Sequence, residues 1–368
     1  AADSILEVVI QAQNVNLAQN SQIEANKVTV TAVNSVTGYG SIIGRGANPL
    51  VNILANVFNF HGAILVNANI SNNTTPGTIR ITADDLTLPS SGKLEANGEV
   101  DGGTIILKAN ATGTINIEGT IQTNGGNGRG GEINISDAND IIISNNAIIQ
   151  SNADNGGNIQ IFTNSGDLIL QNALIQTNGS NGRGGSIGIS ATNQTFIQNS
   201  NIEAKGFNQG GTILIGNDAD HGTLPFSIYT DIDTNSVITT DALLNNQNQI
   251  NPDYVGGFIE TSAHTLNLLG TINAGRGGMW LIDPVDITVD ATLASNIATA
   301  LLTSDVTIAT SSSTACVNVS CTNNAVSGAG DITIASPISS YGTKTLTFTA
   351  DHQVIVNAQI QVGGALVF

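Results

Sequence analysis

Paired carboxylates are the residues of this sequence whose type and spacing could do chemistry. Asp231 and Asp233 alternate in a short run, so an extended chain would place both on one side of a strand. Enzymes that cleave glycosidic bonds use two carboxylates about 5–10 Å apart, one of which acts as a general acid. A histidine, His221, also lies close to one pair. The candidate pairs are Asp84-Asp85, Asp218/Asp220 and Asp231/Asp233.

The surroundings of these aspartates favour a structural interpretation. No Gly-His-Gly or Arg-x-Lys motif accompanies them, and basic residues do not cluster near them. We therefore interpret them as solvated turn aspartates and predict a protein that is not an enzyme and has no cofactor. The alternative is a polysaccharide-degrading β-helix enzyme, either a lyase or a glycoside hydrolase. The pairs could also bind Ca²⁺ weakly, although the sequence lacks the Gly-Gly-x-Gly-x-Asp repeat of calcium-binding rolls.

Three arginines share the context Gly-Arg-Gly-Gly: Arg129, Arg183 and Arg276. Arg129 and Arg183 occupy the same position in copies of one repeat, so they are expected on one edge of the fold, two coils or roughly 10 Å apart. Such a row could bind an anionic glycan. Alternatively, these are corner arginines that pair with Asp or with exposed carbonyls. We favour the second interpretation because the chain has 10 basic against 28 acidic residues.

The element that must position these residues is a repeat marked by glycine pairs. Successive pairs are separated by units of nearly constant length, in which a slightly longer unit alternates with a slightly shorter one. The sequence from Ile121 to Gly131 is largely repeated from Ile175 to Gly185, so a second period of two units is superimposed on the first. A fixed period of roughly 20–50 residues indicates a solenoid, a propeller or an array. The pairs are Gly102-Gly103, Gly130-Gly131, Gly156-Gly157, Gly184-Gly185 and Gly210-Gly211.

One repeat unit contains about three short strands. Between Gly130 and Asn155, isoleucines alternate with polar residues in two runs, and Ile148 follows a third break. The unit is too short for a four-stranded propeller blade and lacks the framework of a leucine-rich repeat. Three strands and three corners fit one coil of a parallel β-helix, in which each strand pairs with its counterpart one coil away. The sequence therefore predicts an all-β solenoid of roughly 15 coils with loop insertions.

Composition excludes several functional classes. The chain has 368 residues and a net charge of −18, so it lacks the basic footprint of proteins that bind nucleic acid or anionic membranes. Charged residues make up 10% and aromatic residues 4% of the sequence, as expected for a thin aliphatic core under a Ser/Thr/Asn-rich surface. No apolar run is long enough for a transmembrane helix, and no signal peptide is evident. We expect a segment of a longer chain or a processed unit.

Four segments follow from the pattern. Residues 1–76 are predicted to form irregular β-helix coils, and residues 77–215 the regular Gly-Gly array. The period breaks in residues 216–255, which we interpret as one long coil with loops or a coil plus an insertion. Residues 256–368 are again predicted to form β-helix coils. This segment also contains a cysteine loop and one short surface helix or lid, predicted from Thr292 to Ser304.

The stretch from about residue 222 to 290 resembles the filamentous-haemagglutinin-type adhesins, large exoproteins of Gram-negative bacteria. The residues that carry the resemblance are Gly-Gly-Phe-Ile-Glu-Thr-Ser at 256–262 and Gly-Gly-Met-Trp-Leu-Ile-Asp-Pro at 277–284, followed by Val-Asp-Ile-Thr-Val. The resemblance implies a right-handed parallel β-helix, secretion through an outer-membrane partner and surface adhesion. The Asn-Pro-Asn-Leu-type signature of that family's secretion domain is absent from this sequence.

In an exported protein, Cys316 and Cys321 are expected to form a disulfide that pins a loop. Two thiols cannot complete a zinc site, and their Cys-x₄-Cys spacing is not the redox motif.

The repeat pattern, the composition and the resemblance together favour one functional hypothesis. It is a non-enzymatic extracellular adhesin or fibre shaft, secreted or held at the cell surface, that contacts an unidentified glycan or protein receptor. End-to-end stacking into a homo-oligomer or filament is a further expectation, because open solenoid ends expose strand edges.

Overall fold

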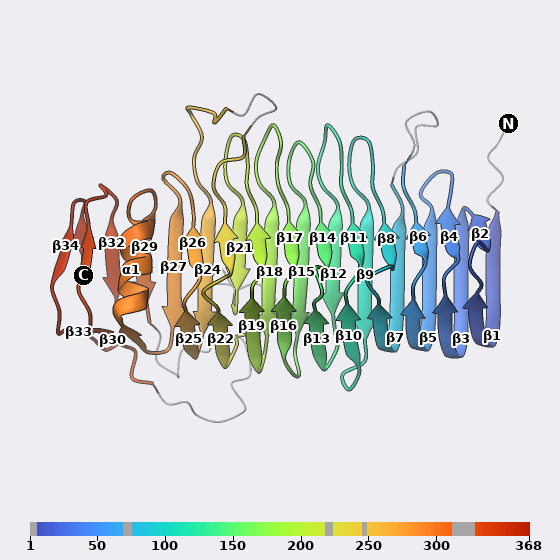
Figure 1. Cartoon of the computed structure of the whole chain (residues 1–368), viewed down its shortest axis with the longest axis horizontal. Coiled ribbons are helices and arrows are strands. Elements are labelled where there is room, and N and C mark those ends of the chain that lie inside the picture. Colours follow the sequence, from blue (N-terminus) through green and yellow to red (C-terminus); the bar gives the residue numbers. More distant parts are fainter. Residues whose placement is uncertain (1–5, 69–75, 218–223, 245–248, 311–327) are drawn as a thin grey trace.

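The computed structural model is a rod of stacked coils and describes residues 6–68, 76–217, 224–244, 249–310 and 328–368 (Figure 1). It confirms the predicted parallel β-helix, because each strand pairs in parallel with the equivalent strand of the next coil. The regular unit holds the three predicted strands, β12 (Glu132–Ser136), β13 (Asp140–Ile143) and β14 (Ile148–Gln150). No helix among the described residues is long and apolar enough to cross a membrane.

The first stack of strands runs the whole length of the rod and contains fourteen strands, close to the expected number of coils. Besides β12, its members are β1 (Glu7–Leu17), β3 (Lys27–Gly38), β5 (Leu50–Phe60), β7 (Thr78–Leu88), β9 (Thr104–Ala109), β15 (Asn158–Thr163), β18 (Ser186–Ala191), β21 (Thr212–Ile215), β24 (Phe258–Ala263), β27 (Met279–Pro284), β29 (Asp305–Ala309), β32 (Leu346–Thr349) and β35 (Leu366–Val367).

The second stack begins as the far halves of β1, β3, β5 and β7, which bend around a corner where β1 and β3 shift register. From β9 onward a turn separates the two stacks. The separate strands are β10 (Thr114–Ile117), β13, β16 (Leu168–Gln171), β19 (Gln194–Gln198), β22 (Tyr229–Ile232) and β25 (Thr265–Leu268). The first four coils therefore use strands of 11 or 12 residues instead of two short ones.

The third stack forms a separate 10-stranded sheet. Its strands are β2 (Gln22–Ala25), β4 (Ser41–Gly44), β6 (Ala63–Leu65), β8 (Lys93–Glu95), β11 (Thr120–Gln122), β14, β17 (Leu174–Gln176), β20 (Asn201–Glu203), β23 (Val237–Thr239) and β26 (Thr271–Asn273). Residues 216–255 supply β22 and β23, which pair on both sides with the strands of neighbouring coils. This segment therefore holds one coil that carries long loops.

The only helix of the described residues, α1 (Ala291–Ala300), replaces a strand of the third stack. It contacts β26 on one side and β31 (Ile338–Ser340) on the other, and its Leu293 and Ile297 are buried. Asn296 Nδ2 donates to the carbonyls of Leu268 and Gly270 in the preceding coil. The helix is thus the predicted short surface helix, with one face exposed, and it forms part of the solenoid wall rather than a lid. Asp290 caps its first turn, and it ends at Ala300 rather than at Ser304.

Around and beyond this helix the first stack continues, and the other faces of the coils form two small sheets. One contains β28 (Ile287–Val289), β30 (Asp331–Ile334) and β33 (Gln353–Val356), and the other pairs β31 with β34 (Ile360–Val362). Cys316 and Cys321, with the predicted disulfide, lie outside the described residues.

The core is a set of aliphatic columns inside the coils. Since side chains alternate along a strand, every second residue points inward and meets its equivalent one coil away. One column of fully buried residues follows the register of the first stack: Val28, Val51, Ile79, Ile105, Ile133, Ile159, Ile187, Ile213, Ile259, Trp280, Val306 and Leu346. Trp280 therefore fills the core, and its Nε1 donates to Thr261 Oγ1 at 3.0 Å.

The glycine pairs lie at the corner between the third and first stacks. A Cβ atom on Gly131 would lie 2.0 Å from the carbonyl oxygen of Gly103, in the preceding coil. On Gly130 it would lie 2.1 Å from the carbonyl oxygen of Ser151. Both positions require glycine because backbone packs against backbone there.

Candidate functional site

Loops of alternating length line one edge of the rod, between the third and first stacks (Figure 1). They begin after β11, β14, β17 and β20 and end at the glycine pairs. Gln122 and Gly131 are nine positions apart, and Gln150 and Gly157 are seven. The next loop, after Gln176, is again nine positions long. The two-coil period of the sequence therefore appears as a ridge, a trough and a second ridge. We call this edge the amide corner.

A ladder of asparagines fixes the start of each loop. The side-chain oxygen of each asparagine accepts a hydrogen bond from the backbone N–H of the equivalent residue in the next coil. The distance is 2.7 Å from Asn97 Oδ1 to Asn124 N, 2.8 Å from Asn124 Oδ1 to Asn152 N and 2.6 Å from Asn152 Oδ1 to Asn178 N. The ladder continues from Asn178 Oδ1 to Lys205 N at 2.8 Å. Each loop is thereby held in register with the next.

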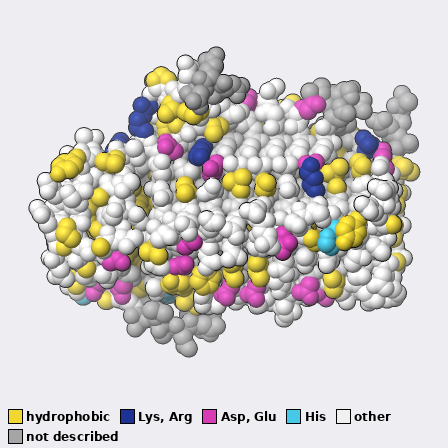
Figure 2. Space-filling model, in the orientation of Figure 1, with side chains coloured by type: hydrophobic (Ala, Val, Ile, Leu, Met, Phe, Trp, Pro, Cys, Tyr) yellow, Lys and Arg dark blue, Asp and Glu magenta, His cyan; other side chains and the backbone are white. Residues whose placement is uncertain are grey.

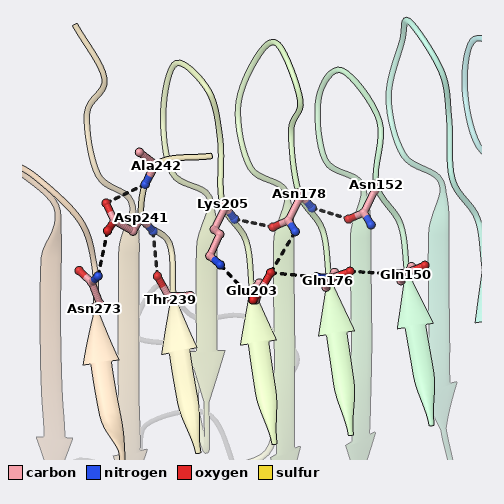
Figure 3. Close-up of polar contacts among 10 residues, drawn as sticks. All are labelled: Gln150, Asn152, Gln176, Asn178, Glu203, Lys205, Thr239, Asp241, Ala242 and Asn273. Carbon is pink, nitrogen blue, oxygen red and sulfur yellow. Dashed lines mark hydrogen bonds and ion pairs between the residues drawn. The ribbon is translucent and has the colours of Figure 1, made fainter. Parts of the chain in front are cut away.

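A parallel ladder of glutamines lies on the adjacent outer face of the third stack. Gln122 Nε2 donates to Gln150 Oε1 at 2.7 Å, and Gln150 Nε2 donates to Gln176 Oε1 at 2.6 Å. Gln176 then donates to the carboxylate of Glu203, which also pairs with Lys205 at 3.0 Å (Figure 3). Burial alone would raise the pKa of Glu203, but the hydrogen bonds and the charge of Lys205 lower it overall. An ionised carboxylate therefore ends the ladder.

A cleft with a volume of about 830 Å³ follows the trough between the two ridges. About half of its surface is polar and comes from asparagine amides, the Ser180 hydroxyl, backbone groups and one carboxylate. Lys, Arg and His are absent from its lining among the described residues. The rod face drawn in Figure 2 is likewise mostly neither hydrophobic nor charged. The lining residues are Asn124 to Asn127 on one ridge, Asn152 to Asp154 in the trough, Asn178, Ser180 and Asn181 on the other ridge, and Leu243 and Leu244 at one end.

The two leucines reach the cleft because the long loop after β23 is anchored at both ends. Asp241 accepts hydrogen bonds from Ala242 N at 2.7 Å and from Asn273 Nδ2 at 3.0 Å (Figure 3). Near the other end, the hydroxyl of buried Tyr254 donates to the Thr240 carbonyl at 2.6 Å. Burial, and then the nearby Asp241 carboxylate, raise the pKa of Tyr254, so this hydroxyl remains a donor.

The three predicted arginines occupy one column along the same corner. The N–H groups of Gly102, Gly156 and Gly256 donate to the backbone carbonyls of Arg129, Arg183 and Arg276, respectively. The Arg276 guanidinium donates to the carbonyls of Pro252 and Tyr254, which is the structural role that we favoured.

The other two arginines of the column differ from Arg276. The side chains of Arg129 and Arg183 are exposed, and neither guanidinium bonds to another residue within the described ranges. Arg129 also borders a shallow depression of about 500 Å³ over the glycine pairs. A ligand role for Arg129 and Arg183 stays a prediction.

The structure ties Asp84, Asp85 and Asp233 to turns. Asp231 instead lies in strand β22 and is half-buried, so the interpretation as a solvated turn aspartate was wrong for this residue. Asp233 accepts hydrogen bonds from Asn199 N, Asn235 N and Ser236 Oγ, and Asp231 from Asn267 Nδ2 at 2.6 Å. Asp84 and Asp85 bond to the turn one coil away, at Asn110 and Thr114. Asp218, Asp220 and His221 lie outside the described residues. Within the described ranges, no three His, Cys, Asp or Glu side chains form a metal-binding group.

A different pair of carboxylates was missed by sequence reasoning. Glu260 lies in β24 between residues that point inward, so its side chain points to the outer side of the sheet. It is nevertheless fully buried. Ser262 Oγ donates to its Oε1 at 2.7 Å, and Ser262 is in register with Asp283 of β27. Burial, and then the charge of Glu260, raise the pKa of Asp283 to about 7. Counting from Gly257 and Gly278 would have placed Ser262 beside Asp283, because both are five positions on.

Comparisons with known proteins add little to this geometry. No protein-family model matches the chain, and no curated protein matches it. Among solved structures, the chain is similar to the HMW1 secretion domain from Haemophilus influenzae, with a TM-score of 0.34 and 13% identity over 74% of this chain and 90% of that chain. A similarity of this size carries no argument about function.

Proposed function

We propose that this protein is a non-enzymatic attachment protein of the cell exterior, in which a rigid β-helical shaft presents the loops of the amide corner. The observation that carries the proposal is the asparagine ladder. Its hydrogen bonds of 2.6–2.8 Å hold successive loops in fixed register, so the corner offers a repeating polar surface rather than independent loops. Such a surface can bind an extended partner at several coils at once, which raises the avidity of weak contacts.

Two further features support this proposal. The resemblance of residues 222–290 to filamentous-haemagglutinin-type exoproteins favours secretion through an outer-membrane partner. The net charge of −18, together with the low charged fraction of 10%, favours a polar partner over nucleic acid or an anionic membrane. The receptor would be a glycan or protein on another surface.

The proposal is tested with beads coated with the whole chain. We expect them to adhere to polysaccharide films or cultured cells more than beads coated with an unrelated β-helical protein of similar charge. Soluble chain in excess should displace them. In parallel, the chain is incubated with the same polysaccharides, and no increase in reducing ends or unsaturated sugars is expected. Adhesion equal to that of the control, or release of sugar products, would contradict the proposal.

A further inference from the structure

We propose that the cleft of the amide corner binds a neutral oligosaccharide through the side-chain amides of Asn124 and Asn152. This inference rests on the proposed attachment function and names the ligand class of that same surface. Four observations carry it: fixed hydrogen-bond donors, a carboxylate acceptor, the absence of basic groups from the described lining, and the size and shape of the cleft.

The donors are oriented by the ladder itself. The oxygens of Asn124 and Asn152 accept hydrogen bonds from the N–H groups of Asn152 and Asn178 at 2.8 and 2.6 Å. The Nδ2 groups of Asn124 and Asn152 donate no hydrogen bond to any residue that the structure describes, although both residues line the cleft. Because the oxygen is held, the amide cannot rotate freely, and its two N–H groups are fixed before a ligand arrives. Fixed donors lose little conformational entropy on binding.

The acceptor is Asp154 in the trough between the ridges. Its Oδ1 accepts hydrogen bonds from Ser180 Oγ at 3.0 Å and from Asn181 Nδ2 at 2.7 Å. Its Oδ2 accepts none from the described part of the chain. Sugar hydroxyls both donate and accept, so they can bond to this carboxylate and to the asparagine amides together.

The charge of the cleft selects a neutral ligand over an anionic one. Among the described residues that line the cleft, Asp154 is the one charged side chain. No Lys or Arg lies in this lining to balance its negative charge. An acidic sugar would bring a second negative charge close to Asp154 in a protein of net charge −18. Sulfated and uronic-acid chains are therefore disfavoured at this site.

The size of the cleft suits several sugar rings. Its volume of about 830 Å³ lies within the roughly 300–1,000 Å³ range of ligand sites. The ridges that border it are two coils or roughly 10 Å apart. At one end, Leu243 and the 45% exposed Leu244 supply an apolar shelf for the C–H face of a ring.

The test is calorimetric titration of the whole chain with hexasaccharides. The neutral probes are maltohexaose, cellohexaose, chitohexaose and mannohexaose, and the anionic probes are a heparin-derived hexasaccharide and hexagalacturonate. We expect saturable binding of at least one neutral probe and weaker or absent binding of both anionic probes.

Variants locate the site. In N124D and N152D the ladder oxygen is kept while the N–H donors are lost, so each should weaken binding about three- to tenfold, as for one or two hydrogen bonds. N97D is the matched control, because Asn97 has the same ladder role at 2.7 Å but does not line the cleft. N97D should bind like the parent chain. The exposed Leu244→Ser is a second variant that does not touch the ladder and should also weaken binding. Thermal unfolding confirms that each variant is folded.

The outcomes separate this inference from the attachment function. If no neutral hexasaccharide binds, the cleft proposal is overturned, whether or not coated beads still adhere. Stronger binding of an anionic probe, or equal weakening by N97D and N152D, would also overturn it. If beads fail to adhere while a neutral probe binds in an Asn152-dependent manner, the attachment function fails and the site stands.

Discussion

The side-chain oxygen of Asn152 lies 2.6 Å from the backbone nitrogen of Asn178, one coil further along the rod. This contact is one step of a ladder in which a side chain satisfies the backbone donor of the next coil. A loop that would otherwise depend on water is thus tied to its neighbours. The ladder joins the sequence repeat to a continuous surface that could contact a partner.

The first prediction concerns this ladder. Asn152→Ala leaves the Asn178 N–H without its acceptor and should destabilise the local structure by about 1–2 kcal/mol. Since a solenoid is stabilised by nearest-neighbour contacts, the change should remain local. Native-state hydrogen exchange should show faster exchange of the Asn178 amide. Asn127→Ala is the control, because Asn127 is exposed on the neighbouring ridge and its side chain makes no hydrogen bond to the described residues. Equal exchange in both variants would contradict the ladder.

The second prediction concerns the glycine corner. In Gly131→Ala the new methyl group would lie 2.0 Å from the Gly103 carbonyl oxygen, which cannot move without shifting a coil. We expect a destabilisation of roughly 2–4 kcal/mol, typical of a severe backbone or packing conflict. Chemical denaturation measures it. The matched control is Gly188→Ala in β18, where the nearest atom is the flexible end of Gln160 at 2.3 Å. If the Gly188 variant were the more damaging one, the close-approach argument would be wrong.

The third prediction is a pH dependence of stability from Asp283. The pKa of this carboxyl is raised from 3.8 to about 7 by burial and by the Glu260 charge. Between these values the folded chain keeps a proton that the unfolded chain has released. The free energy of unfolding should therefore fall as pH rises from about 4 to about 7, by on the order of 2–4 kcal/mol. Above pH 7 this contribution is constant.

The variant Asp283→Asn should remove this slope. At pH 8 its melting temperature should exceed that of the parent chain, and at pH 4 the two should nearly agree. Asp253→Asn, at an exposed loop position, serves as the control and should give no such pH-dependent gain. A parent-like slope in Asp283→Asn would show that Asp283 does not set the pH dependence.

The fourth prediction concerns the anchor of the long loop. The Arg276 guanidinium donates to the carbonyls of Pro252 and Tyr254, so Arg276→Gln should loosen residues 249–255. Limited proteolysis within residues 249–255 should become several-fold faster while the rest of the rod stays intact. Arg183→Gln is the matched control, since its exposed side chain holds no loop within the described residues. Equal cleavage rates in the two variants would remove Arg276 from this role.

The sequence by itself determined the coil. The nearly constant spacing of the glycine pairs predicts the length of one coil. The alternation of residues such as Ile133 and Ile135 predicts which side chains point inward. These are properties of a local backbone period, so they can be deduced without knowing the stacking. The position of Arg129 and Arg183 in one column followed from the same count.

Tertiary structure alone decided the cleft and the pairing of Glu260 with Asp283. The cleft is formed by two ridges whose coils are two repeat units apart in the sequence. Leu243 and Leu244, from the long loop that follows β23 of the third stack, close one end of it. Asp283 acquires its raised pKa only when β24 and β27 are stacked and Glu260 loses its water. The place of α1 in the wall likewise depends on a strand that is missing from the third stack. Burial arises from the stacking of coils, and a single coil does not bury its own outer face.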